Sequence, residues 1–250
     1  MILSLNKLVL EDLVSQSTIA NKNYQIIHHE GPDARGIDCA LLYDPLHFKV
    51  TSSKSVKFTI PGNDRFRSRD QLVVSGELLG EKIHIIVIHW PSRRGGESKS
   101  RPKRIAAAKL SKSIVDSLQQ INKKAKVIVM GDFNVAPTEL DIGIGEQNAK
   151  RWLRDGKTAF LPEEIEMWNR IKDLGFVDSW RKQNPEEGSI YSWFDYRSRM
   201  FDDNPKRGLR IDHILLSENI EHAILDTGID YSARAMEKPS DHCPIWLELK

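Results

Sequence analysis

Short apolar runs with the length of β-strands recur along the whole chain, and amphipathic helices lie between them. In the last run, residues 245–250 (IWLELK), Ile245, Leu247 and Leu249 fall on one face, which is the period-two pattern of a half-buried strand. Further strands are predicted over 24–28, 37–43, 56–60, 71–78, 82–89, 126–130 and 209–217. Helices are predicted over 3–14, over about 103–122, and from just after Pro162 to Gly175. This mixture predicts an α/β fold with two sheets packed face to face and helices outside them.

Length and composition favour a single domain over residues 1–250. The chain has 250 residues, of which 40% are hydrophobic, which fits one large α/β domain or two small ones, and no Pro/Gly/Ser-rich linker is long enough to divide it. The mean hydropathy is −0.45, and the longest apolar run, 83–90, is interrupted by two histidines and is far too short to cross a bilayer. No secretory signal is recognisable. We therefore expect a soluble, cytoplasmic monomer that does not bind membranes, with Cys39 and Cys243 as free thiols.

Positive charge is concentrated in residues 92–126. This stretch holds eleven Lys and Arg residues against two acidic ones, a local charge of +9 in a chain whose net charge is +2. A protein that binds a polyanion is expected to carry such a concentration, and a solvated helix face with flanking loops would show it as well. Arg93, Arg94 and Arg101 are the candidate phosphate contacts, because they lie on a glycine-rich loop after a strand.

Four predicted strands carry polar residues at or near their ends, where side chains meet solvent and one another. These residues are Asp132 and Asn134 after 126–130, Asp212 within 209–217, His89 at the end of 82–89, and Asp241 with His242 before the last strand. A carboxylate inside an apolar strand is costly unless it is paired, so Asp212 calls for a partner. One strand followed by Gly-Asp is usually only a turn, but four polar strand ends in one chain point to a shared site.

Carboxylates, an amide and a histidine in one place are the groups that metal-assisted phosphoester hydrolysis requires. A hard divalent cation prefers carboxylate oxygens. An amide N–H can hold the phosphate, and a histidine held by an aspartate can act as a general acid or base or as a cationic phosphate contact. The residues therefore predict a phosphoester hydrolase that uses Mg²⁺ or Mn²⁺.

Three of these stretches resemble motifs of the endonuclease/exonuclease/phosphatase superfamily, whose fold is similar to that of deoxyribonuclease I. They are 131–143 (GDFNVAPTELDIG), 207–217 (RGLRIDHILLS) and 236–249 (MEKPSDHCPIWLEL). Over 131–250 the resemblance is closest to bacterial exonuclease III, which 143–164 and 191–212 match almost continuously. Residues 5–130 resemble another bacterial branch, in 35–48 (RGIDCALLYDPLHF) and 89–110 (HWPSRRGGESKSRPKRIAAAKL). The resemblance implies a four-layer α/β sandwich, with the two kinds of sequence joined near Met130.

The same resemblance implies a role for each polar residue at the strand ends. Asp132 would orient or deprotonate the attacking water, and Asn134 would hydrogen-bond the phosphate in the transition state. Asp212 would hold His242 against the phosphate, and Asp241 would join Asp132 in binding metal. Which of Asp132 and His242 acts as the base stays open. His89 either lies beside the phosphate or is a simple strand-end histidine, and Arg210 either braces the strand of Asp212 or touches phosphate.

Aromatic and arginine side chains alternate in the segment 191–199 (YSWFDYRSR). An aromatic wedge flanked by arginines suits insertion at a base step together with backbone contacts, although some of these rings must belong to the core. By resemblance Trp193 is the candidate wedge, with Tyr196 and Arg197 as further contacts. The implied substrate is duplex DNA with abasic sites or free 3′ ends.

The start of the chain departs from the pattern of the superfamily. Members open with a strand that ends in an Asn and a second strand that ends in a metal-binding Glu. Here the recognisable pattern begins at 6–14 (NKLVLEDLV), and residues 1–5 (MILSL) match neither strand. Glu11 falls on a predicted helix, so the metal-binding role is not transferred to it. The expected sandwich therefore lacks its first two strands, and we expect weakened metal binding and reduced activity.

The sequence leaves three candidate functions. The first is a metal-dependent deoxyribonuclease that trims 3′ ends and nicks abasic sites. The second is a phosphomonoesterase or phosphodiesterase acting on nucleotide, lipid or sugar phosphates. The third is an inactive fragment that binds nucleic acid. The aromatic and arginine residues of 191–199 favour the first.

Overall fold

The computed structural model describes residues 2–4, 7–145, 165, 168–169, 171–197, 199–237 and 240–250. They form two compact units, each made from two stretches of the chain. The first unit is Met1–Trp90 with Lys109–Gly131, and the second is Pro91–Ala108 with Asp132–Lys250. The described residues contain no helix that is both long and apolar enough for a bilayer. Both cysteines are buried free thiols, as predicted.

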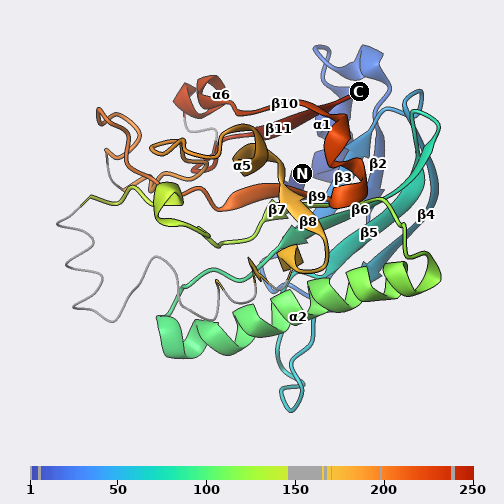
Figure 1. Ribbon diagram of the computed structural model, residues 1–250, viewed down its shortest axis with the longest axis horizontal. Helices are drawn as coiled ribbons and strands as arrows, with labels where there is room; N and C mark the ends of the chain where they lie inside the picture. Colours follow the sequence, from blue (N-terminus) through green and yellow to red (C-terminus); the bar gives the residue numbers. More distant parts are fainter. Residues whose placement is uncertain are drawn as a thin grey trace. The chain divides into compact units, whose positions relative to one another are not determined.

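The first unit contains most of the β-structure (Figure 1). Its elements are β1 (Ile2–Ser4), α1 (Lys7–Ser15), β2 (Gln25–His28), β3 (Asp38–Tyr43), β4 (Phe48–Val56), β5 (Gln71–Leu78), β6 (Glu81–His89) and β7 (Val127–Asp132), together with the part of α2 (Glu97–Ile121) from Lys109 onward. β3 pairs with β1 and β2 in an antiparallel sheet. β4, β5, β6 and β7 are neighbours in that order in another.

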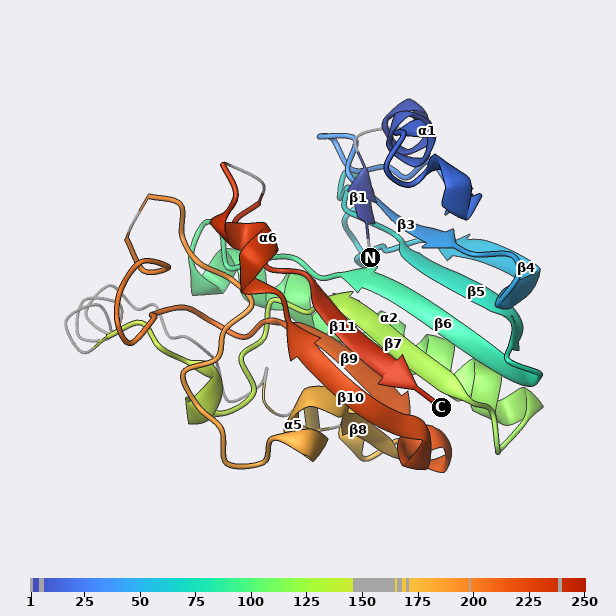
Figure 2. The same ribbon diagram turned by 90° about the horizontal axis from the view of Figure 1, so that it is seen from above.

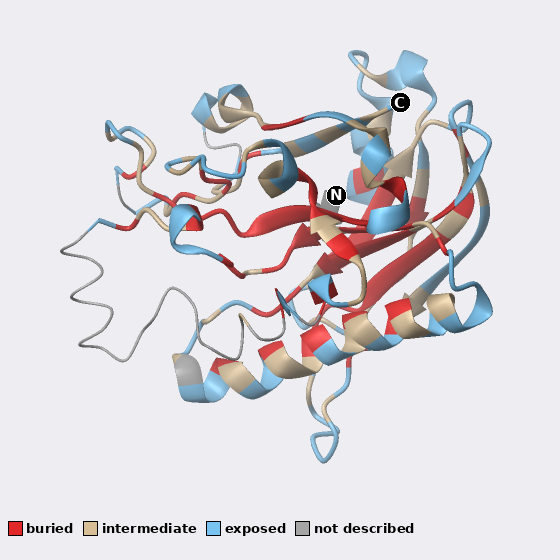
Figure 3. Cartoon of the chain, viewed as in Figure 1, coloured by how far each residue is buried: buried red, intermediate tan, exposed pale blue. Residues whose placement is uncertain are grey.

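The central strands of the first unit are apolar on both faces, so both faces must be covered. Leu72, Val73 and Val74 of β5 are all buried, and so are the middle residues of β6 and β7 (Figure 3). β3 packs against β5 and β6. α2 is anchored through Ser111, which accepts from Trp90 Nε1 and donates to Gln71 Oε1. The ends of β6 and β7 are thereby held by a core that tolerates little movement.

In its described residues, the second unit combines strand pairs with short helices. Its elements are the start of α2, β8 (Phe176–Asp178), α5 (Ser179–Gln183), β9 (Asp212–Ser217), β10 (Ile224–Ile229), α6 (Tyr231–Ala235) and β11 (Ile245–Leu249). β8 pairs with β9, and β10 pairs with β11, both antiparallel. β11 lies beside β9, as Figure 2 also shows. The first residue of β9 and the residues before β11 are therefore brought to the same end of this unit.

Several predicted boundaries were wrong. The strand predicted over 56–60 is instead β4, Phe48–Val56, an edge strand whose polar residues conceal it. The helix predicted over 3–14 begins at Lys7, because residues 2–4 form β1. α2 begins at Glu97 rather than 103 and continues through Pro102 in its second turn, where a proline was expected to mark the helix start. β9 begins at Asp212 rather than 209, and β10 was not predicted. Most of the helix predicted after Pro162 lies outside the described residues.

Candidate active site

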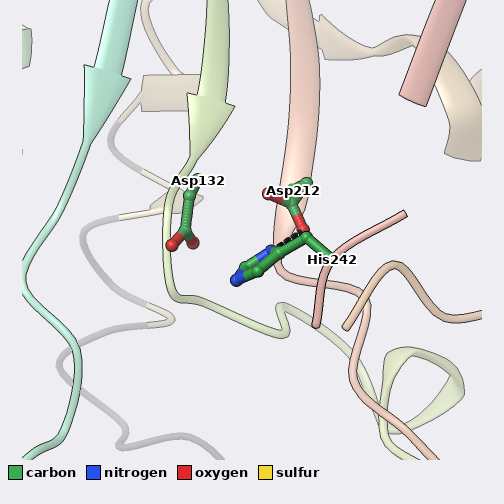
Figure 4. A group of neighbouring side chains, drawn as sticks. All are labelled: Asp132, Asp212 and His242. Carbon is green, nitrogen blue, oxygen red and sulfur yellow. Dashed lines mark hydrogen bonds and ion pairs between the residues drawn. The ribbon is translucent and has the colours of Figure 1, made fainter. Parts of the chain in front are cut away.

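Asp132, Asp212 and His242 gather at one place in the second unit (Figure 4). Asp132 is the last residue of β7, Asp212 is the first residue of β9, and His242 precedes β11. One ligand atom from each side chain lies within 4.8 Å of the others. A hydrogen bond of 3.0 Å from Phe133 N to Ile211 O holds the two aspartate-bearing segments together. The convergence of strand ends predicted from the sequence is thus present for these three residues.

Asp212 is fixed by a serine and bound to the histidine. Ser192 Oγ donates to Asp212 Oδ2 over 2.6 Å, and it accepts from the backbone N–H groups of Ile211 and Asp212 over 3.1 Å each. The same carboxylate oxygen accepts from His242 Nδ1 over 2.8 Å. Asp212 therefore has the partners that its buried position requires.

His242 carries a positive charge at neutral pH. Burial of the ring opposes the charged form, but the charge and hydrogen bond of Asp212, with the nearby charges of Asp132 and Asp241, outweigh burial and raise the pKa of His242 to about 10. An imidazolium donates from both ring nitrogens and accepts from neither. This state suits contact with a phosphate better than removal of a proton from water.

Asn134 holds the Asp132 carboxylate by two hydrogen bonds. Its backbone N donates to Asp132 Oδ1 and its Nδ2 donates to Asp132 Oδ2, both over 2.7 Å. This geometry requires Asn134 to take a left-handed backbone conformation with φ of 52°, which asparagine adopts more readily than most residues. Asp132 is buried, so its carboxylate is presented in one orientation.

Asp241 lies next to this group and is held by Trp193. The indole Nε1 donates to Asp241 Oδ2 over 3.0 Å, and Trp193 also forms isolated β-bridges to Leu209 and His242. Trp193 is half-buried against the core around Phe194. The structure therefore gives Trp193 a contact that positions Asp241, and its role as a wedge stays a prediction.

The remaining substrate candidates differ in exposure. Arg94 is exposed, Arg93 and Arg101 are half-buried, and Tyr196 is 49% exposed with Arg234 stacked on its ring. Arg197 is exposed and pairs with Asp195. Arg101 belongs to the first turns of α2, so its predicted place on the glycine-rich loop was wrong. His89 ends β6 in the first unit, where it is half-buried.

Arg210 is buried in an ion cluster, which favours the bracing role over the phosphate contact. Its guanidinium is 1% exposed and donates to Asp141 Oδ1 over 2.6 Å and to Asp178 Oδ2 over 2.8 Å. It also lies 3.0 Å from His213 Nδ1, and His213 Nε2 lies 2.8 Å from Val135 O. Arg210 thus braces the segments that carry Asp212 and Asn134, which is the bracing alternative.

The side chains of the site fit a hard divalent cation. Asp132 and Asp212 offer carboxylate oxygens, and Asp241 adds a third negative charge close to His242. Mg²⁺ commonly binds through one or two carboxylates and keeps water or phosphate oxygens as its other ligands. The carboxylates of Asp132 and Asp212 and the His242 ring together form a group that could hold such an ion. Glu11 is exposed on α1 and pairs with Lys7 over 3.2 Å.

Two residues of the site were missed by sequence reasoning. Ser192 orients Asp212, and only its place in the aromatic segment could have drawn attention to it. Arg104 is 2% exposed and donates to Asn134 O, although its sequence neighbours suggested a solvated basic face. Neither residue type has a pattern that separates such a role from a surface position.

Comparison with known proteins agrees with this geometry. A model of the Endonuclease/Exonuclease/phosphatase family matches residues 4–169. The exodeoxyribonuclease III of Haemophilus influenzae is 38% identical over 232 residues, which cover 92% of this chain and 82% of that protein. The chain belongs to the endonuclease/exonuclease/phosphatase family. The alignment with exodeoxyribonuclease III is long enough to include part of the first half, where a second branch was predicted.

Solved structures of the family support the same fold. A Neisseria 3′ phosphatase, determined with a product DNA hairpin, is 28% identical with a TM-score of 0.59, over 80% of this chain and 72% of that one. An AP endonuclease from Archaeoglobus fulgidus has a TM-score of 0.66 over 92% of this chain and 81% of that one, at 23% identity. These structures confirm the predicted α/β sandwich of the endonuclease/exonuclease/phosphatase family.

Proposed function

We propose that this chain is a metal-dependent nuclease of the DNA repair type, which removes nucleotides from 3′ ends and cleaves the backbone at abasic sites. The observation that carries the proposal is the group of Asp132, Asp212 and His242, in which a cationic histidine lies within 4.8 Å of two carboxylates. Support for DNA as substrate comes from the exodeoxyribonuclease III relative and from the Neisseria structure with a DNA hairpin.

The protonated state of His242 favours one division of labour between Asp132 and His242. Asp132, oriented through both oxygens by Asn134, positions the attacking water and takes its proton. His242, kept protonated by Asp212, donates a hydrogen bond to a phosphate oxygen. Asn134 contributes its amide to the phosphate in the transition state. This assignment makes Asp132 the base and His242 the electrostatic contact.

The cofactor in this proposal is Mg²⁺ or Mn²⁺, held by Asp132 and Asp241, with Asp212 within reach. Its chemistry would be to neutralise the charge that develops on the phosphate. Arg93, Arg94, Arg101, Tyr196 and Arg197 are proposed to contact the DNA backbone, and Trp193 to support Asp241 beside it.

The proposal also covers the domain organisation, the oligomeric state and the location of the enzyme. We propose that residues 1–250 act as one domain, as a monomer in the cytoplasm. His89, at the end of β6, stays a proposed phosphate contact. DNA binding through arginine and lysine should weaken steeply with salt.

The chemistry is tested with a labelled duplex that carries one abasic site. Cleavage is measured across a Mg²⁺ titration for the natural protein and for Asp132→Asn, which keeps the shape of the side chain. We expect the rate to fall by about 10²–10⁴-fold, because the base is lost. Asp226→Asn, which changes an exposed carboxylate on β10, is the matched control and should cleave normally.

Two outcomes would contradict the proposal. Equal cleavage by the natural protein and Asp132→Asn would show that Asp132 takes no part in the reaction. An intact duplex that is nevertheless bound would make the chain a nucleic-acid-binding protein. Parallel reactions with nucleotide, lipid and sugar phosphates would show whether small phosphoesters are the substrates instead.

A further inference from the structure

A buried arginine joins the start of α2 to the backbone of the candidate active site. Arg104 is 2% exposed, and its guanidinium donates from Nη2 to Asn134 O and from Nη1 to Pro91 O, each over 2.7 Å. All three residues belong to the second unit. A charge is costly to bury, so these hydrogen bonds to carbonyl oxygens are needed to hold it there.

The carbonyl group that Arg104 binds belongs to Asn134, whose backbone conformation is uncommon for a residue other than glycine. Asn134 has φ of 52°, in the left-handed region. In this conformation its N and Nδ2 both donate to the Asp132 carboxylate. A contact that fixes the peptide after Asn134 therefore also fixes the direction of Asp132.

From these contacts we propose that Arg104 is a positioning residue for the Asp132–Asn134 pair, a role that rests on the nuclease function proposed above. The planar guanidinium reaches two carbonyl groups with two nitrogen atoms in fixed geometry. A lysine ammonium is a single point and does not reproduce this fork. The second carbonyl, that of Pro91, lies at the start of the loop with Arg93 and Arg94, so one side chain also ties that loop to Asn134.

The direct test is Arg104→Lys, which keeps the charge and removes the fork. We expect kcat for abasic-site cleavage to fall by about 10²-fold while KM changes little, because the reacting groups are displaced and the DNA contacts stay. Added guanidinium ion, below denaturing concentrations, should restore part of kcat in Arg104→Ala. The matched control is Arg67→Lys, because Arg67 Nη1 also donates to two backbone carbonyls, Asp64 O and Phe66 O, and belongs to the first unit.

A second measurement does not depend on activity. Hydrogen exchange of the Asn134 amide, read by NMR, reports the hydrogen bond from Asn134 N to Asp132 Oδ1. Exchange should become faster in Arg104→Lys and stay unchanged in Arg67→Lys. If Arg104→Lys does not fold, Arg104→Gln is measured in the same way.

The outcomes separate this proposal from the nuclease function. Normal kcat and normal Asn134 exchange in a folded Arg104 variant would overturn the positioning role even if the natural protein cleaves DNA. Equal losses of kcat in the Arg104 and Arg67 variants would reduce Arg104 to a structural residue and overturn the role as well. If the natural protein cleaves no DNA, the nuclease function fails, and faster exchange in Arg104→Lys still supports the role of Arg104 in holding Asn134.

Discussion

Opposing effects set the pKa of the His242 ring, and their balance decides whether the ring is protonated at neutral pH. Burial alone would favour a neutral ring, yet Asp212 bonds Nδ1 and Asp132 and Asp241 add negative charge. The result is a pKa of about 10 instead of 6.5. Because the folded pKa is raised, the stability from this pairing is complete below about pH 6.5 and is lost as the pH rises toward 10.

The first prediction concerns this proton. In the metal-free protein, the NMR signals of the His242 ring should titrate near pH 10, and Asp212→Asn should lower that pKa by removing the partner charge. The slope of stability between pH 6.5 and 10 should flatten in the same variant. Asp226→Asn serves as control and should leave the titration in place. A ring that titrates near 6.5 in the natural protein would contradict the cationic role of His242.

Among the elements, β8, α5 and β9 depend on one buried ion cluster. Arg210 joins Asp178, the last residue of β8, to Asp141, and Arg181 of α5 also donates to Asp141. Burial would raise the pKa of both carboxyl groups, but the Arg210 charge and its hydrogen bonds outweigh burial and hold both pKa values below the ordinary range. The cluster keeps Asp212, two residues after Arg210, at the start of its strand.

The second prediction is that Asp178→Asn lowers the free energy of unfolding at neutral pH by up to about 3–5 kcal/mol, because buried Arg210 keeps only Asp141 of its two carboxylate partners. Depressed carboxyl pKa values stabilise the fold above about pH 4, and this stability is lost as the pH falls below it. Denaturant unfolding between acid and neutral pH should therefore show a smaller pH dependence for the variant.

The matched control for Asp178→Asn is Asp230→Asn. Both aspartates cap a short helix, Asp178 that of α5 and Asp230 that of α6, and asparagine is an equally good cap. Asp230 is half-buried and accepts from Ser232 Oγ and from the backbone N–H groups of Ser232 and Ala233, rather than from an arginine. Equal losses of stability in the two variants would show that the ion cluster contributes nothing beyond capping.

Elements with strong apolar patterns could be predicted from the sequence, and those shaped by tertiary contacts could not. β5, β6 and β11 stand where their patterns placed them. β10 was missed because Asp226, Thr227 and Gly228 interrupt its pattern. Gly228 is needed there, since a Cβ atom would lie 2.4 Å from the Trp246 ring. That contact belongs to the pairing of β10 with β11 and leaves no local signal.

Some residues of the candidate site could likewise be predicted from the sequence, and others could not. Asp132, Asp212 and His242 were predicted because polar residues at strand ends are conspicuous next to apolar runs. Arg104 and Arg210 look alike in the sequence, as basic residues near polar neighbours, and burial alone separates them from Arg94 and Arg197. The partners of a buried arginine lie far along the chain, as Asn134 does from Arg104, so only the fold identifies them.

For the whole molecule, the path of the chain bears on the proposal of a single domain. The chain enters each unit twice, α2 begins in the second unit and continues in the first, and β7 carries Asp132 from the first unit to the second. Neither unit is therefore a continuous stretch of sequence that could fold before the rest is made. This favours joint folding of residues 1–250.

The third prediction is that thermal unfolding shows one cooperative transition, with equal calorimetric and van't Hoff enthalpies. Differential scanning calorimetry in metal-free buffer measures both. Two resolved transitions, one of which disappears in Asp178→Asn, would show that the units unfold separately and would contradict the single domain.

The most direct test of the function is a product map from one duplex that carries an abasic site and a labelled 3′ end. With Mg²⁺ the protein should cut at the abasic site and shorten the 3′ end stepwise, and chelation of the metal should abolish both reactions. Intact DNA under conditions in which a small phosphomonoester is hydrolysed would contradict the nuclease function and assign the site of Asp132, Asp212 and His242 to another class of phosphate ester.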